Sequence, residues 1–112
     1  MLIMAWYIVG AEIPEAYAIA LVNYAFAIQN EDGGWPTYTY GAQSTSLMGT
    51  ILMYVVLRLM GFGAQHERMI RARKSLLSMG GAVHLPCWAK FWLCLLGLYK
   101  WEGSDPYPAE MW

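Results

Sequence analysis

Gln29-Asn30-Glu31-Asp32-Gly33-Gly34-Trp35 is the stretch from which the fold of this chain can be worked out. An apolar run of helical character ends at Gln29, and acidic turn residues follow it. Two adjacent glycines then allow the backbone to reverse before Trp35 and Pro36 enter the next segment. The stretch therefore predicts a helix end and a tight turn rather than a catalytic loop.

Short helices are predicted on both sides of this turn. Met1 to Val9 is nearly all apolar, and a second helix runs from Pro14 to about Gln29. Proline is favoured in the first turn of a helix because the N–H that it lacks has no helical partner there. After the turn, Ser44 or Thr45 is the expected N-cap of a third helix that ends near Gly61.

Two further helices follow. The fourth covers about Gln65 to Met79 and is amphipathic, and its expected inward-facing residues are Met69, Ile70, Leu76 and Leu77. Gly80-Gly81 ends it, and a fifth helix runs from about Cys87 to Tyr99. A helix, a glycine pair and a helix therefore occur twice, as expected of helix-hairpin repeats. Two hairpins alone leave apolar faces uncovered, so the sequence predicts an all-α fold that forms an incomplete arc of an α/α toroid.

The composition excludes several classes of protein. Of the 112 residues, 58% are hydrophobic and only 13% are charged, whereas about 25% charged is typical of soluble domains. So little polar surface indicates that the chain packs against something larger or associates with a membrane. No uninterrupted apolar run reaches the roughly 18 residues of a membrane-spanning helix. A net charge of −1 argues against nucleic acid as a partner.

Few residues could carry chemistry. His66 and His84 have no cysteine or acid at metal-ligand spacing, and no metal or cofactor is expected. Glu31-Asp32 lies beside two glycines, where turn formation is the simpler role. Trp88 and Trp92 are four residues apart and share one face of the fifth helix. They are either core aromatics, which is the commoner role of such pairs, or part of the wall of an apolar cavity.

Five further segments are as characteristic as the opening turn: Ser44-Thr45-Ser46-Leu47-Met48-Gly49-Thr50, Gly80-Gly81-Ala82, Lys90-Phe91-Trp92-Leu93, Tyr99-Lys100-Trp101-Glu102-Gly103 and Pro108-Ala109-Glu110-Met111-Trp112. The spacing of Gln29, Gly33 and Trp35 resembles the Gln-Trp repeat motif of the triterpene cyclases. Taken together, these segments resemble that family over nearly the whole chain. Within it they are most similar to oxidosqualene cyclases of the lanosterol synthase type.

The resemblance implies a fold and an activity. Such enzymes consist of two α/α barrels, so residues 1–112 would be part of the N-terminal barrel domain. They protonate the epoxide of the lipid 2,3-oxidosqualene and guide a carbocation cascade to lanosterol or a related triterpene, as isomerases of steroid biosynthesis. By resemblance, Trp88 belongs to the substrate-cavity wall and Trp92 is its neighbour. Gln29, Gly33 and Trp35 would stabilise the ring of helices.

The catalytic acid of the resembled family lies in an Asp-Cys-Thr-Ala-Glu motif, which this sequence lacks. We therefore expect a fragment that has no catalytic residue and no turnover of its own. The implied partners are the remainder of the cyclase barrels and a membrane surface, with peripheral attachment to the endoplasmic reticulum membrane or a lipid droplet. The alternative is a non-enzymatic helical module that packs on a partner or a membrane surface.

Overall fold

The computed structural model describes residues 2–37 and 44–103, except for the side chains of Cys87 and Trp88. The described residues are helical and form no strand. An isolated antiparallel bridge joins Trp35 to Ser46. The elements are α1 (Leu2–Ile8), α2 (Glu15–Ile28), α3 (Leu47–Leu59), α4 (Glu67–Ser78), a 3-10 turn (Ala82–His84), α5 (Cys87–Leu95) and a second 3-10 turn (Trp101–Gly103). The predicted all-α fold is confirmed, and the segment 108–112 lies outside the described residues.

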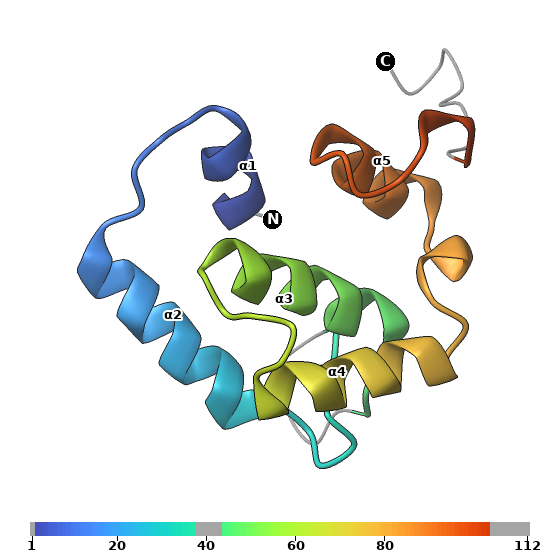
Figure 1. The fold of residues 1–112 in the computed structure, drawn as a ribbon, viewed down its shortest axis with the longest axis horizontal. Coiled ribbons are helices and arrows are strands. Elements are labelled where there is room, and N and C mark those ends of the chain that lie inside the picture. Colours follow the sequence, from blue (N-terminus) through green and yellow to red (C-terminus); the bar gives the residue numbers. More distant parts are fainter. Residues whose placement is uncertain (1, 38–43, 104–112) are drawn as a thin grey trace.

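Helix α3 is the central element of the fold (Figure 1). In this view α1 and α5 lie above it and α4 lies below it. One apolar cluster, here called the α1/α3/α5 cluster, consists of Ile3, Met4, Ile51, Val55, Val56, Leu85, Ala89 and Leu93. A second, the α2/α3/α4 cluster, consists of Ala25, Trp35, Leu57, Met69 and Ala72. Helix α3 contributes residues to both clusters and therefore lies between two apolar cores.

The N-cap of α3 differs from the prediction of Ser44 or Thr45. Ser46 is the N-cap, and its Oγ accepts a hydrogen bond of 3.0 Å from the N–H of Gly49. The hydroxyl of Thr45 instead donates to the Oδ1 of Asp32 at 2.6 Å. Thr45 is therefore used to close the preceding turn, and the helix begins one residue later.

Helix α5 also ends earlier than the predicted Tyr99. It ends at Leu95 because Gly97 adopts a φ of +73°, a conformation that favours glycine. The N–H of Leu98 then donates to the carbonyl of Leu93 at 2.9 Å, and the N–H of Gly97 donates to that of Cys94 at 3.0 Å. These bonds turn the chain back, so Tyr99 lies on a return segment.

The inward face of α4 was partly mispredicted. Met69 is buried, but Ile70 is 39% exposed and Leu77 is 58% exposed. Small residues, Ala72 and Ser75, fill the buried positions instead. The reason is the close approach of the glycine turn, since a Cβ added to Gly34 would lie 2.9 Å from the Oγ of Ser75.

Helix α2 lies at the edge of the fold and is apolar on most sides. Ala25 is its buried residue, whereas Tyr17, Ile19 and Tyr24 are exposed. Among the described residues, no helix combines the length and the apolar character that crossing a membrane requires.

Candidate functional site

Gln29 links the end of α2 to helix α4. Its Nε2 donates to the carbonyl of Gly33 at 2.8 Å and to the carbonyl of Arg68 at 3.1 Å. Arg68 in turn donates through Nη1 to the carbonyl of Phe26 at 2.9 Å and to the Oε1 of Gln29 at 3.4 Å. The carbonyl of Phe26 lies in the last turn of α2, where carbonyl groups lack helical partners, and the guanidinium of Arg68 supplies one.

The glycine pair lets the turn approach the backbone of α4. Gly33 has a φ of +91°, and a Cβ built on it would lie 2.5 Å from both the carbonyl carbon and the oxygen of Arg71. The Nη2 of Arg71 donates to the carbonyl of Glu31, so the turn and the helix are also joined through a side chain. Any larger residue at position 33 would push the turn away from α4.

Trp35 is fully buried in the α2/α3/α4 cluster. Its indole Nε1 donates to the carbonyl of Ala25 at 2.7 Å, and its backbone N–H donates to the Oγ1 of Thr50 at 3.1 Å. The hydroxyl of Thr50 donates to the carbonyl of Ser46 at 2.7 Å. Trp35 therefore ties α2 to the start of α3 from inside the core.

The acidic residues of the turn act on the turn itself. The Oδ1 of Asp32 accepts a hydrogen bond of 2.9 Å from the N–H of Gly34, in addition to the bond from Thr45. Within residues 2–37 and 44–103, no three histidine, cysteine or acidic side chains gather into a group that could hold a metal ion.

Helix α5 has one buried face and one open aromatic face. Ala89, Leu93 and Cys94 are buried on the first. Because successive residues of a helix are about 100° apart, Phe91, Trp92 and Leu95 lie on the opposite side. Phe91 and Trp92 are half-buried, and Leu95 is 42% exposed. The aromatic side of α5 is therefore only partly covered by the described chain.

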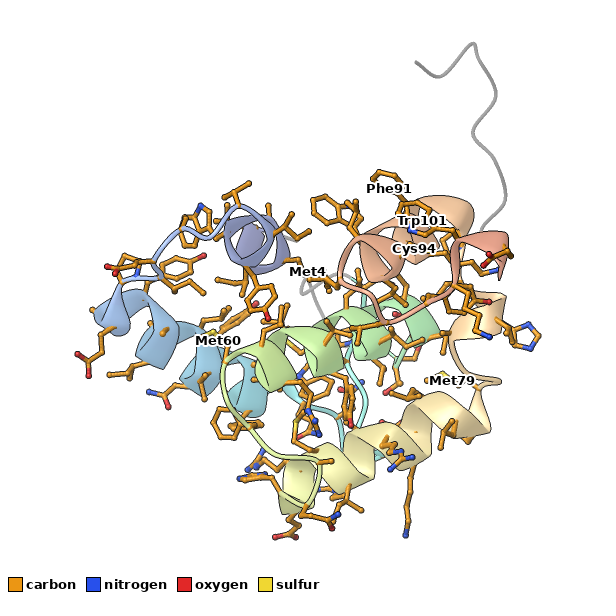
Figure 2. All side chains as sticks on the ribbon, turned by 45° about the horizontal axis from the view of Figure 1, so that its top comes forward. Met4, Met60, Met79, Phe91, Cys94 and Trp101 are labelled. Atoms are coloured by element: carbon orange, nitrogen blue, oxygen red, sulfur yellow. The ribbon has the colours of Figure 1, made fainter. Side chains whose placement is uncertain are left out.

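The two tryptophans predicted for a cavity wall belong to this helix. Trp92 packs at the edge of the α1/α3/α5 cluster. Trp88 lies one turn earlier in α5, and its side chain is outside the described part of the structure. Phe91 meets the ring of Trp101 edge to face, with a centroid distance of 5.7 Å, and Figure 2 shows these two residues next to one another. We call Phe91, Trp92 and Leu95, with the backbone position of Trp88, the aromatic face of α5.

An apolar hollow of about 280 Å³ lies elsewhere, between α1, α2 and α3. Leu21, Met48 and Leu52 are among its lining residues, and Trp92 is not. The structure therefore does not bring the tryptophan of α5 into this hollow.

Two residues that hold the 29–35 turn were missed by sequence reasoning. The guanidinium of Arg68 binds the end of α2 and lies 5.1 Å from the ring centroid of Phe26, although a charged residue on an amphipathic helix is expected to face solvent. Thr50 is fully buried between Trp35 and Ser46. Its spacing of one helical turn from Ser46 was the available signal, because a threonine hydroxyl often bonds the carbonyl four residues earlier.

Comparison with known proteins gives a consistent result over the whole chain. The family model described as the squalene-hopene cyclase N-terminal domain matches residues 1–112. A terpene cyclase/mutase from a Nectria species is 50% identical over 98% of this chain and 15% of its own length. A lanosterol synthase from Aspergillus fumigatus is 44% identical over 98% of this chain and 15% of its own length. Lanosterol synthase from Saccharomyces cerevisiae is 44% identical over 95% of this chain and 14% of its own length.

The chain thus spans about 15% of the length of the first of these relatives. The helices of this chain pack around two apolar clusters, as in a segment of an α/α toroid. The α/α toroid is the fold to which this domain family belongs. The full-chain match and the all-helical architecture agree. The chain belongs to the family of the squalene-hopene cyclase N-terminal domain.

Proposed function

We propose that this chain forms part of the N-terminal barrel of an oxidosqualene cyclase, an isomerase that converts 2,3-oxidosqualene to lanosterol or a related triterpene. Its contribution to that reaction is a section of cavity wall. The observation that carries the proposal is the aromatic face of α5, which the chain's own clusters leave partly uncovered. This face lies within a segment that matches two lanosterol synthases over 95% or more of its length.

The chemistry of the reaction explains why such a face is suitable. A folded polyene that passes through a series of carbocations must be protected from water and from nucleophilic side chains. An aromatic ring attracts a cation by about 0.5 to 2 kcal/mol without offering a lone pair to it. Trp92 and Trp88, one turn apart on α5, would present two such rings to neighbouring positions of the polyene.

The proton that starts the cascade comes from outside residues 1–112 in this proposal. Asp32 does not suit that role, since its Oδ1 accepts two hydrogen bonds within its own turn. Gln29, Gly33 and Trp35 act on stability, because their contacts join helices and do not reach the aromatic face of α5. The remaining barrel and a membrane surface, at the endoplasmic reticulum or a lipid droplet, complete the proposed setting.

A chimaera tests this function directly. Residues 1–112 replace the matching segment of Saccharomyces cerevisiae lanosterol synthase, and the chimaera is expressed in yeast that lacks its own enzyme. We expect growth without added ergosterol and formation of lanosterol. Trp88→Ala and Trp92→Ala should lower the yield or change the product profile. Trp6→Ala is the matched control, because it removes an indole that packs against the α1/α3/α5 cluster from α1. An unchanged profile in both α5 variants would contradict the cavity-wall role.

A second candidate function is a non-enzymatic helical module. The exposed apolar side chains of α2, with Ile19 at 55% exposure, favour a chain that packs on a partner. The two functions differ in one measurement on the chimaera. Rescue of yeast growth would favour the cyclase, whereas a folded chimaera that forms no cyclised product would favour the module.

A further inference from the structure

Helix α5 carries a lysine on its buried face. Lys90 is only 9% exposed, and its neighbours on that face are Ala89, Leu93 and Cys94. No carboxylate of the described residues forms an ion pair with it. Its Nζ lies 5.7 Å from the ring centroid of Tyr99, within the range of a cation–π contact. The low exposure belongs mainly to the methylene stem of Lys90, and an apolar side chain of similar length, such as methionine, could fill the same space without an ammonium group. Stability of the fold alone therefore does not explain a lysine at this position.

The partner of Lys90 lies on the segment that returns along α5. Gly97, with its φ of +73°, reverses the chain after the helix. Tyr99 then meets Lys90, and Trp101 meets Phe91 at a centroid distance of 5.7 Å and an interplanar angle of 72°. Lys90 and Phe91, which are consecutive in α5, thus each contact one aromatic residue of the return segment.

The placement of these two contacts around α5 matters. Lys90 and Phe91 are about 100° apart around the helix axis, so their contacts act from different sides. Two contacts in different directions add to the packing of Ala89 and Leu93 in opposing a roll of the helix about its axis. Trp92, the next residue, moves with the helix. With side chains reaching about 5 Å from the axis, a roll of roughly 20° would displace its ring by nearly ~2 Å.

We propose that Lys90 is a positioning residue, which acts through Tyr99 to fix the rotation of α5 and thereby the direction in which Trp92 faces the substrate cavity. The inference rests on the proposed cyclase function. Displacement of a positioning group by about 1 Å can cost about 100-fold in rate. A roll of α5 would accordingly change how well the cascade is guided without unfolding the protein.

The first part of the test measures the position of Trp92 in the 112-residue chain itself. The chain is labelled with 5-fluorotryptophan, and the resonances of Trp92, Trp101 and Trp35 are assigned by single substitutions to phenylalanine. We expect Lys90→Met to shift or broaden the Trp92 and Trp101 signals and to leave that of Trp35 unchanged. Lys90→Arg and Tyr99→Phe, which keep the cation and the ring, should leave all three in place.

An unchanged Trp92 signal in Lys90→Met would overturn the proposal. If the Trp35 signal changes as well, the whole fold has been affected. In that case Tyr99→Leu, which removes the aromatic ring of the same contact, replaces Lys90→Met. It is judged in the same way, by whether the Trp92 signal changes while the Trp35 signal does not.

The second part measures products in the chimaera. We expect Lys90→Met to raise the share of incompletely cyclised products by about tenfold and to lower kcat more than it changes KM, with Lys90→Arg restoring both. If the Lys90→Met chimaera has the same product profile and the same kcat as the unsubstituted chimaera, the positioning role is refuted. The cyclase function would remain intact. An inactive unsubstituted chimaera would instead count against the proposed function, and the fluorine signals would still decide the role of Lys90.

Discussion

Gly33→Ala is expected to separate the 29–35 turn from α4. The change has two effects at once. Alanine at a φ of +91° adopts the left-handed conformation, which costs about 1–2 kcal/mol. The new Cβ would also lie 2.5 Å from backbone atoms of Arg71, so an ordinary contact of 3.4 Å requires a shift of roughly 0.9 Å in the turn or in α4. Forcing such a shift in a packed site typically costs a further ~1–3 kcal/mol.

Gly61→Ala provides the matched control for this prediction. Gly61 has a similar φ of +102°, but a Cβ built on it meets nothing within 4 Å. It should therefore show the conformational cost alone, and the difference between the two variants isolates the contact with α4. We expect Gly33→Ala to lose about 2–5 kcal/mol and Gly61→Ala about 1–2 kcal/mol.

Urea unfolding followed by circular dichroism at the helical band measures both losses on the 112-residue chain. The larger loss is a substantial part of the roughly 5–15 kcal/mol by which domains are stable. Equal midpoints for the two variants, with equal slopes, would show that the turn does not press on α4. The close approach of Gly33 to α4 would then make no measurable contribution to the free energy of unfolding.

Two other substitutions test contacts around the same turn. Ser46→Ala removes the N-cap of α3 and should cost about 1 kcal/mol, while Ser44→Ala, one of the two positions suggested by the sequence, should leave the thermal midpoint in place. Trp35→Phe removes the bond from Nε1 to the carbonyl of Ala25 and leaves a small cavity, for an expected loss of about 1–3 kcal/mol. Its urea midpoint should fall at unchanged slope, and Trp6→Phe, which keeps a ring beside Tyr17, should lose much less. A fall of equal size in both tryptophan variants would argue against a special role for the indole N–H.

The sequence predicts the number and order of the helices well because glycine and proline punctuate them. Gly33 and Gly97 illustrate what helps and what does not. The first stands in a doublet after an acidic turn, and its role was recognised. The second is a single glycine in an apolar run, so the run was extended to Tyr99 although the helix ends at Leu95. An isolated glycine gives no sign of its φ until the bonds around it are known.

The errors on α4 and in the site have a different origin. Hydrophobicity alone assigns Ile70 and Leu77 to the interior, whereas the turn approaches α4 so closely that Ala72 and Ser75 are needed there. Lys90 was missed because a charged residue is expected outside. Its contact with Tyr99 forms only because the chain reverses after α5.

The position of α3 between two cores has a consequence for how the chain opens. Its residues Ile51 and Val55 belong to one cluster and Leu57 to the other, so loss of either cluster exposes one side of the same helix. Helix α1 packs against one cluster, through Ile3, Met4 and Trp6, and can detach with less disruption. The amide hydrogens in the middle of α3 should therefore exchange with solvent only through global unfolding, while those of α1 exchange through local opening. In kinetic terms, the loss of α3 packing determines the rate of global unfolding. Local opening of the surrounding helices determines how often the sides of α3 are briefly exposed to solvent.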